Sequence, residues 1–109
     1  MAEIWRAWDR LNREVIFDTA DRDHILAEHD EMADRLHMIR EAIEDPEFVN
    51  RDVQYRRREN YYRWLPTEER WLKVVVNFRP VPPQGTWAGE VITAYPVKRP
   101  KAREERLYP

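Results

Sequence analysis

The sequence predicts a single α+β domain, in which N-terminal helices pack on one face of a roughly four-stranded antiparallel sheet. Before Pro46 the apolar residues recur with a helical period, and after Phe48 they alternate with polar residues as in strands. Prolines and short polar turns separate the alternating segments from one another. The length of 109 residues is that of one domain.

Residues 1–14 are expected to form an N-terminal amphipathic segment ahead of the main domain, which we assign to residues 15–95. Ile4, Trp8 and Leu11 stand at positions i, i+4 and i+7, which is the spacing of one face of a short helix. The next apolar run, residues 15–17, is short and β-prone.

A first helix of the main domain is expected to begin near residue 19, where Thr19 or Asp21 is placed to cap it. Its apolar stripe contains Ile25, His29 and Met32. This stripe points His29 toward the sheet.

A second helix is expected over residues 33–44, where Leu36, Ile39 and Ile43 share one face. Pro46 ends this helix, because proline lacks the backbone N–H that the next turn needs. Both helices then cover the apolar face of the sheet that follows them.

Four strands are expected, over residues 48–52, 60–65, 71–78 and 87–95. In the third strand one face is wholly apolar (Leu72, Val74, Val76 and Phe78), and the other is mixed (Trp71, Lys73, Val75 and Asn77). With the helices on the apolar side, the mixed side is expected to be open. In the second strand, Tyr61/Arg63/Leu65 and Tyr62/Trp64 are equally plausible inward sets. The charged tail at residues 96–109 is expected to be mobile.

The composition excludes several classes of protein. The chain has no cysteine and no serine, which disfavours disulfide, thiolate and serine-hydrolase chemistry. Only two glycines are present, so a glycine-rich nucleotide loop is also disfavoured. The net charge of −2 gives no global basic field for nucleic acid, so a polyanion would need a local cationic patch. No signal sequence or membrane-spanning run is evident, and a cytoplasmic protein is expected.

Two histidines are the leading candidates for proton transfer. His24 is expected in the first turn of its helix, where the helix N-terminus favours the neutral imidazole that a general base requires. His29 follows five residues later, about 140° around an ideal helix, so the two side chains are not expected to share a face. The simpler interpretation is that His24 is an ordinary exposed histidine and that His29 is a hydrogen-bonded, partly buried one. His24 and Glu28 lack an evident third ligand, so no metal site is predicted.

Cationic and hydroxyl side chains are expected together on the open face of the sheet. Lys73 lies on the mixed face of the strongest strand, and Thr93 and Tyr95 follow on the last strand. A cation, a hydroxyl and an aromatic plane can hold a phosphate and stack a base. The cluster 56–58, three consecutive arginines, is either a solvated turn or a loop that contacts phosphate.

The order of these features resembles a known family of nuclease domains. The matching strings are Asp-His-Ile at 23–25 with His29, Asn-Tyr-Tyr-Arg at 60–63, Leu-Lys-Val-Val-Val at 72–76 and Val-Ile-Thr-Ala-Tyr at 91–95. They resemble the barnase/EndoU/colicin/RelE-like nucleases of phages and mobile elements, over about residues 15–95. The family resemblance implies helices packed on a four-stranded antiparallel sheet and a toxin-like, metal-independent ribonuclease without cofactor.

The resemblance also implies roles for individual residues. The catalytic set is His24, His29 and Thr93, and the phosphate- or RNA-binding set is Lys73, Arg22, Tyr95 and Arg63. RNA is the expected substrate, and a cognate immunity protein, antitoxin or other protein is a possible partner. Glu28 and Asp30 depart from the family pattern, since arginine and proline are common there. The alternative is therefore an inactive nuclease-like domain that binds a protein, with Trp5, Trp8, Trp64 and Trp87 as its contact surface.

Overall fold

The computed structural model describes residues 1–109 as one strongly curved, seven-stranded mixed sheet with two helices. The strands are β1 (Glu3–Trp8), β2 (Glu14–Asp18), β3 (Phe48–Arg51), β4 (Arg58–Leu65), β5 (Arg70–Val81), β6 (Thr86–Val97) and β7 (Glu105–Tyr108). The helices are α1 (Thr19–Glu28) and α2 (His37–Glu44), and a short 3-10 turn, η1 (Asp30–Met32), lies between them. The strand order is β1-β2-β6-β5-β4-β3-β7.

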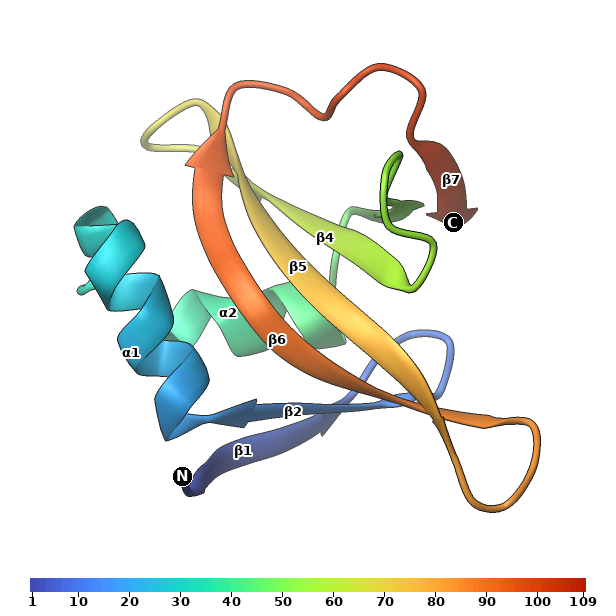
Figure 1. Ribbon diagram of the computed structural model, residues 1–109. Coiled ribbons are helices and arrows are strands. Elements are labelled where there is room, and N and C mark those ends of the chain that lie inside the picture. The colour runs from blue at the N-terminus through green and yellow to red at the C-terminus, as the bar shows by residue number, and fades with distance from the viewer.

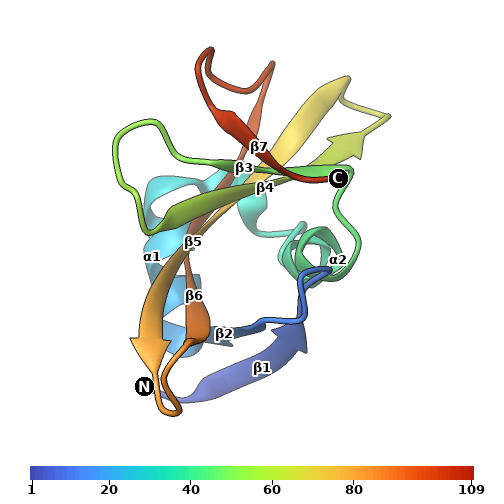
Figure 2. The same ribbon diagram turned by 90° about the vertical axis from the view of Figure 1, so that its right-hand side faces the viewer.

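The four predicted strands are confirmed as β3 to β6, and they form the antiparallel meander that their alternating pattern indicates. The predicted fold class is nevertheless wrong, because the sheet is larger and mixed. The chain adds the β1–β2 hairpin beside β6, where β2 pairs with β6 in parallel, and adds β7 beside β3. The sheet curves so far that its two ends enclose α2 (Figure 2).

The predicted helix at residues 4–11 is also wrong, since residues 3–8 form strand β1. In the strand Trp5 and Ala7 point toward the core, while Ile4 and Trp8 point to solvent. Hydrogen bonding to β2 therefore outweighs the helical spacing of the apolar residues. Trp5 and Ala7, which the helical interpretation left on the polar side, pack in or against the core.

The helix α1 begins as the sequence suggests, although with a different cap. Asp18, at the end of β2, is the N-cap, and its carboxylate accepts a hydrogen bond from the Asp21 N–H at 2.9 Å. Asp21 returns the contact by accepting from the Asp18 N–H, which completes a capping box. His24 consequently lies in the second turn and not in the first, so the helix N-terminus does not act on it as predicted.

The core lies between the concave face of the sheet and α2. The wholly apolar face of β5 is buried as predicted, against Ile39 and Ile43 of α2. On β4 the inward set is Tyr61 and Leu65, which resolves the open choice of register. The helix α1 does not cover this face. It lies alongside β6, beyond the short stretch where β2 pairs with that strand (Figure 1). Among the residues of α1, only Ile25 is buried.

The convex, outer face is not uniformly open, contrary to expectation. Lys73 and Tyr62 point outward from adjacent strands, yet both are buried. The C-terminal residues provide part of this cover, because β7 pairs with β3 and Glu104 lies against the outer face. Residues 105–108 of the tail, predicted to be mobile, are therefore a strand of the sheet.

No helix of the chain has both the length and the apolar character needed to cross a membrane.

Candidate functional site

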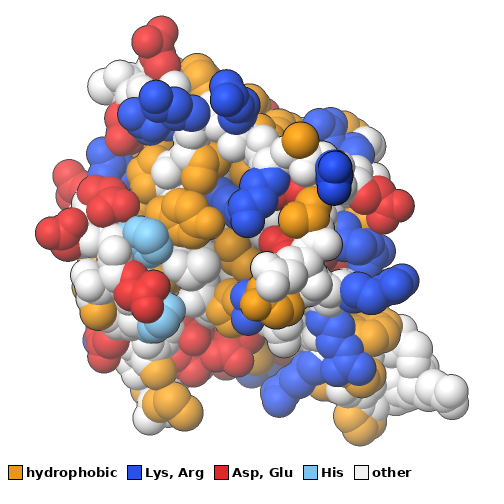
Figure 3. All heavy atoms as spheres, turned by 45° about the horizontal axis from the view of Figure 1, so that its top comes forward, with side chains coloured by type: hydrophobic (Ala, Val, Ile, Leu, Met, Phe, Trp, Pro, Cys, Tyr) orange, Lys and Arg blue, Asp and Glu red, His pale blue; other side chains and the backbone are white.

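An open hollow of about 540 Å³ lies between α1 and the outer face of β6. Its lining consists of His24, Glu28, His29, Arg58, Ile92, Thr93 and Tyr95. Figure 3 shows two histidine side chains together beside an apolar surface, with acidic atoms between them and basic side chains farther across the same view. The hollow thus combines imidazoles, a hydroxyl and an aromatic ring.

The two histidines reach the same hollow because α1 ends between them. His29 is the C-cap of α1, with φ −138° and ψ 74°, so it leaves the helical path. Its ring stacks on Tyr95 with centroids 4.6 Å apart and planes at 19°. The predicted separation of the histidines on an ideal helix is therefore wrong. His24 is half-exposed, and its Nε2 lies 3.6 Å from a carboxylate oxygen of Glu28.

A β-bulge in β6 presents successive residues to this hollow. Val75 of β5 pairs with Thr93, but the next residue, Val76, pairs with Val91, so Ile92 is the extra residue. The bulge leaves Val91 in the core and turns Ile92 and Thr93 toward the hollow. The Oγ1 atom of Thr93 is buried and has no hydrogen-bond partner within the chain. A buried hydroxyl without a partner is unusual and is available to a ligand that reaches it.

Lys73 lies behind Tyr95 and completes the group. It pairs with Tyr95 across β5 and β6, and its Nζ lies 5.7 Å from the centroid of the Tyr95 ring. Only 4% of Lys73 is exposed, and it forms no salt bridge or side-chain hydrogen bond with the rest of the chain. Lys73 therefore places a positive charge behind Tyr95 with no carboxylate at salt-bridge distance, and this favours a role in attracting an anion.

Of the seven residues predicted from the sequence, the structure gathers five and separates two. His24, His29, Thr93 and Tyr95 line the hollow and Lys73 adjoins it. Arg22 instead binds the carboxylate of Asp23 at 3.1 Å, outside the hollow. Arg63 lies on the inner face, where it donates to the backbone carbonyl of Asp45 at the end of α2.

Sequence reasoning missed Arg58 as a lining residue. It is the first residue of β4 and points outward with Asn60 and Tyr62, at the spacing of two that strands require. The start of β4 is hard to recognise within three consecutive arginines, because only the last of them, Arg58, belongs to the strand. The same alternation could have found it once the register of β4 was known.

The four tryptophans of the alternative interpretation do not form one surface. Trp5 packs against Phe17 near the core, and Trp8 is exposed on the edge strand β1. Trp64 and Trp87 lie toward opposite ends of the β4–β5–β6 meander, paired with Trp71 and Pro80 respectively.

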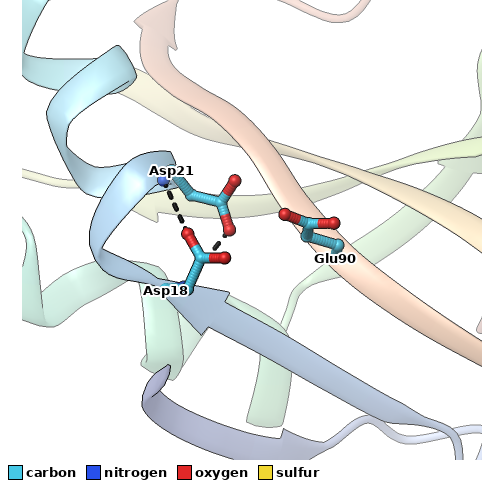
Figure 4. Close-up of side chains that lie close together, drawn as sticks. All are labelled: Asp18, Asp21 and Glu90. Carbon is cyan, nitrogen blue, oxygen red and sulfur yellow. Dashed lines mark hydrogen bonds between the residues drawn. The ribbon is translucent and has the colours of Figure 1, made fainter. Parts of the chain in front are cut away.

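A group of three carboxylates lies beside the hollow's helix, where Asp18, Asp21 and Glu90 bring oxygens within 4.8 Å of one another (Figure 4). Two of them form the capping box of α1. Burial, followed by the neighbouring carboxyl of Glu90, raises the pKa of Asp21 to about 7. This pKa lies far above the 3.8 of a free aspartate.

The raised pKa of Asp21 predicts a pH-dependent stability. The contribution of this group is fully present below about pH 4 and is lost as the pH rises through about 7, because the folded state must then release a proton it holds tightly. After allowance for solvent screening, the loss is on the order of 1 kcal/mol. Asp21→Asn keeps an oxygen that accepts from the Asp18 N–H, so its chemical denaturation at pH 5 and pH 8 should show less of this decline than wild type. Equal declines in the two proteins would contradict the assignment.

No family model, no curated protein and no solved structure matches this chain.

Proposed function

We propose that this protein is a metal-independent endoribonuclease that cleaves RNA by attack of a ribose 2′-hydroxyl on the adjacent phosphate. The observation that carries the proposal is the convergence of His24, His29 and Thr93 on one open hollow, with the buried, unpaired Lys73 next to it. These are the residues that the resemblance to the barnase/EndoU/colicin/RelE-like nucleases implies, apart from Arg22 and Arg63.

The reaction needs a base, an acid and positive charge, and the hollow offers each of them. One imidazole removes the proton from the 2′-hydroxyl, whose oxygen forms a bond to phosphorus. The bond from phosphorus to the 5′-oxygen of the next nucleotide breaks, and the second imidazole gives that oxygen a proton.

The developing negative charge on the phosphate would be met by Lys73, by Arg58 and by the hydroxyl of Thr93. The Nζ of Lys73 lies 5.7 Å from the centroid of the Tyr95 ring, which lines the hollow, so its charge acts at short range there. Tyr95 offers a ring on which a base can stack, although in the free protein His29 covers it. Glu28 adds a negative charge to the lining, and it opposes RNA binding.

The test is to incubate the purified protein with RNA in excess EDTA and to identify the termini of the products. The proposal predicts cleavage that survives chelation and yields 2′,3′-cyclic phosphate and 5′-hydroxyl ends. An otherwise identical oligonucleotide with 2′-deoxyribose at every position is the matched control and should remain intact. Absence of cleavage by folded protein across a range of RNA substrates would leave the inactive, protein-binding interpretation in its place.

A further inference from the structure

The half of the outer face next to the hollow holds a carboxylate from the C-terminal segment. The hydroxyl of Tyr62 donates to Glu104, with its oxygen 2.8 Å and 3.0 Å from the two carboxylate oxygens. The side-chain amides of Asn50 and Asn60 donate to the same group at 3.1 Å and 3.2 Å. Three neutral donors from β3 and β4 therefore converge on one anion.

This carboxylate site is continuous with the histidine hollow. Tyr62 pairs with Lys73, and Lys73 pairs with Tyr95, so one row of outward side chains leads from Glu104 to the stacked ring of His29. Tyr62 and Tyr95, at the two ends of the row, are two strand spacings apart, a distance of about 10 Å. The site and the hollow thus lie along one path across the sheet.

Both a cation, Lys73, and a second carboxylate, Asp52, lie near this position. Lys73 is buried in the row without a salt bridge. Its charge extends to the Asn60 end of the row. At that end, burial acts to raise the pKa of the Asp52 carboxyl. Hydrogen bonds from the backbone N–H groups of Tyr55 and Gln54 and from the Asn60 side chain, together with the charge of Lys73, outweigh burial and lower this pKa. The side-chain amide of Asn60 donates to Asp52 as well as to Glu104, so its N–H toward Glu104 becomes free for another anion only when Glu104 leaves.

We propose that Tyr62, Asn60, Asn50 and Lys73 form a subsite for a backbone phosphate of RNA, and that Glu104 occupies it in the free protein. The inference rests on the proposed function, since it assigns the neighbouring phosphate of the same bound strand. An RNA that crosses the face from the hollow must displace Glu104, so the C-terminal segment limits access to the site.

The segment is attached in a way that allows this displacement. Its only strand, β7, has four residues, lies at the edge of the sheet and pairs with the short strand β3. Edge elements with few buried contacts open at a low cost in free energy. The ring of Tyr62 stays anchored when the segment leaves, because it stacks on Phe48 with centroids 4.9 Å apart.

The experiment measures binding alone, by fluorescence anisotropy of a single-stranded 2′-O-methyl RNA oligonucleotide that cannot undergo 2′-hydroxyl attack. Glu104→Ala should bind about fivefold more tightly than wild type or better. Glu105→Ala is the matched control, because it removes the same charge one residue away, where the carboxylate contacts Arg51 instead of the subsite. Adding Tyr62→Phe to Glu104→Ala should reverse the gain, since it removes a donor and keeps the ring.

Equal affinities for Glu104→Ala and Glu105→Ala would overturn the subsite. If Glu104→Ala does not fold, Glu104→Gln replaces it, with the same expected gain and the same overturning result. The outcomes also separate this inference from the proposed function. Tighter binding by Glu104→Ala without any RNA cleavage supports the subsite and rejects the nuclease, whereas cleavage with no effect of Glu104 rejects the subsite alone.

Discussion

Replacing His24 with alanine is expected to lower kcat/KM for RNA cleavage by about 10²–10⁴-fold, because the proposed mechanism then loses one of its two proton-transfer groups. His24 suits this test because 53% of its side chain is exposed and it holds no core contact. Stability should therefore change by no more than about 0.5 kcal/mol. The measurement is a steady-state rate on a defined oligonucleotide in EDTA, with thermal unfolding measured in parallel.

His37→Ala is the matched control, since His37 is an exposed histidine at the start of α2 and lies outside the hollow. Its rate should equal that of wild type. His29→Ala should also lose activity, but it removes the stacking on Tyr95 as well, so its effect has two causes. Full activity of His24→Ala would show that the hollow is not the site of proton transfer.

Replacing Arg13 with alanine is expected to lower the free energy of unfolding by about 3–5 kcal/mol, the usual cost of leaving buried charges without their partner. The guanidinium donates to both carboxylate oxygens of Glu59, at 2.9 Å and 2.6 Å, and also to Asp9 at 2.9 Å. Side-chain exposure is 1% for Asp9 and 9% for Glu59. The hydroxyl of Tyr61 donates to Asp9 as well, at 2.5 Å, so the loss also disturbs the core face of β4.

Arg40→Ala provides the comparison for this stability prediction. Arg40 and Glu44 form an exposed pair on α2 at 3.2 Å, and such pairs contribute less than about 1 kcal/mol. Urea denaturation of the three proteins at neutral pH measures both effects. A loss below 1 kcal/mol for Arg13→Ala would mean that Asp9 and Glu59 find water or another partner.

The sequence predicted those parts of the fold that depend on local pattern. The alternation in β5 identified both the strand and its buried face, and Pro46 correctly marked the end of α2. The strand β1 was missed because Ile4, Trp8 and Leu11 match a helical spacing by chance, while pairing with β2 decides the outcome. The parallel contact of β2 with β6 joins residues more than 70 positions apart, and no local pattern encodes it.

The candidate site was predictable in its residue types but not in its geometry. His24, His29, Thr93 and Tyr95, named from the sequence and its family resemblance, line one hollow in the structure. Their meeting depends on the end of α1 at Glu28 and on the bulge at Ile92, and both are settled by tertiary packing. Glu104 could not be placed from the sequence, because its docking follows from the pairing of β7 with β3.

The parallel pairing of β2 with β6 also determines the order in which the hollow can form during folding. His24 lies on α1, which directly follows β2, and His29 lies at its C-cap, whereas Thr93 and Tyr95 belong to β6, near the other end of the chain. Loop closure over such a distance opposes early contact, so these groups are expected to meet late, after the β4–β5–β6 meander has formed. A chain arrested before β6 has been synthesised would carry both imidazoles and yet lack the strand that forms the other wall of the hollow.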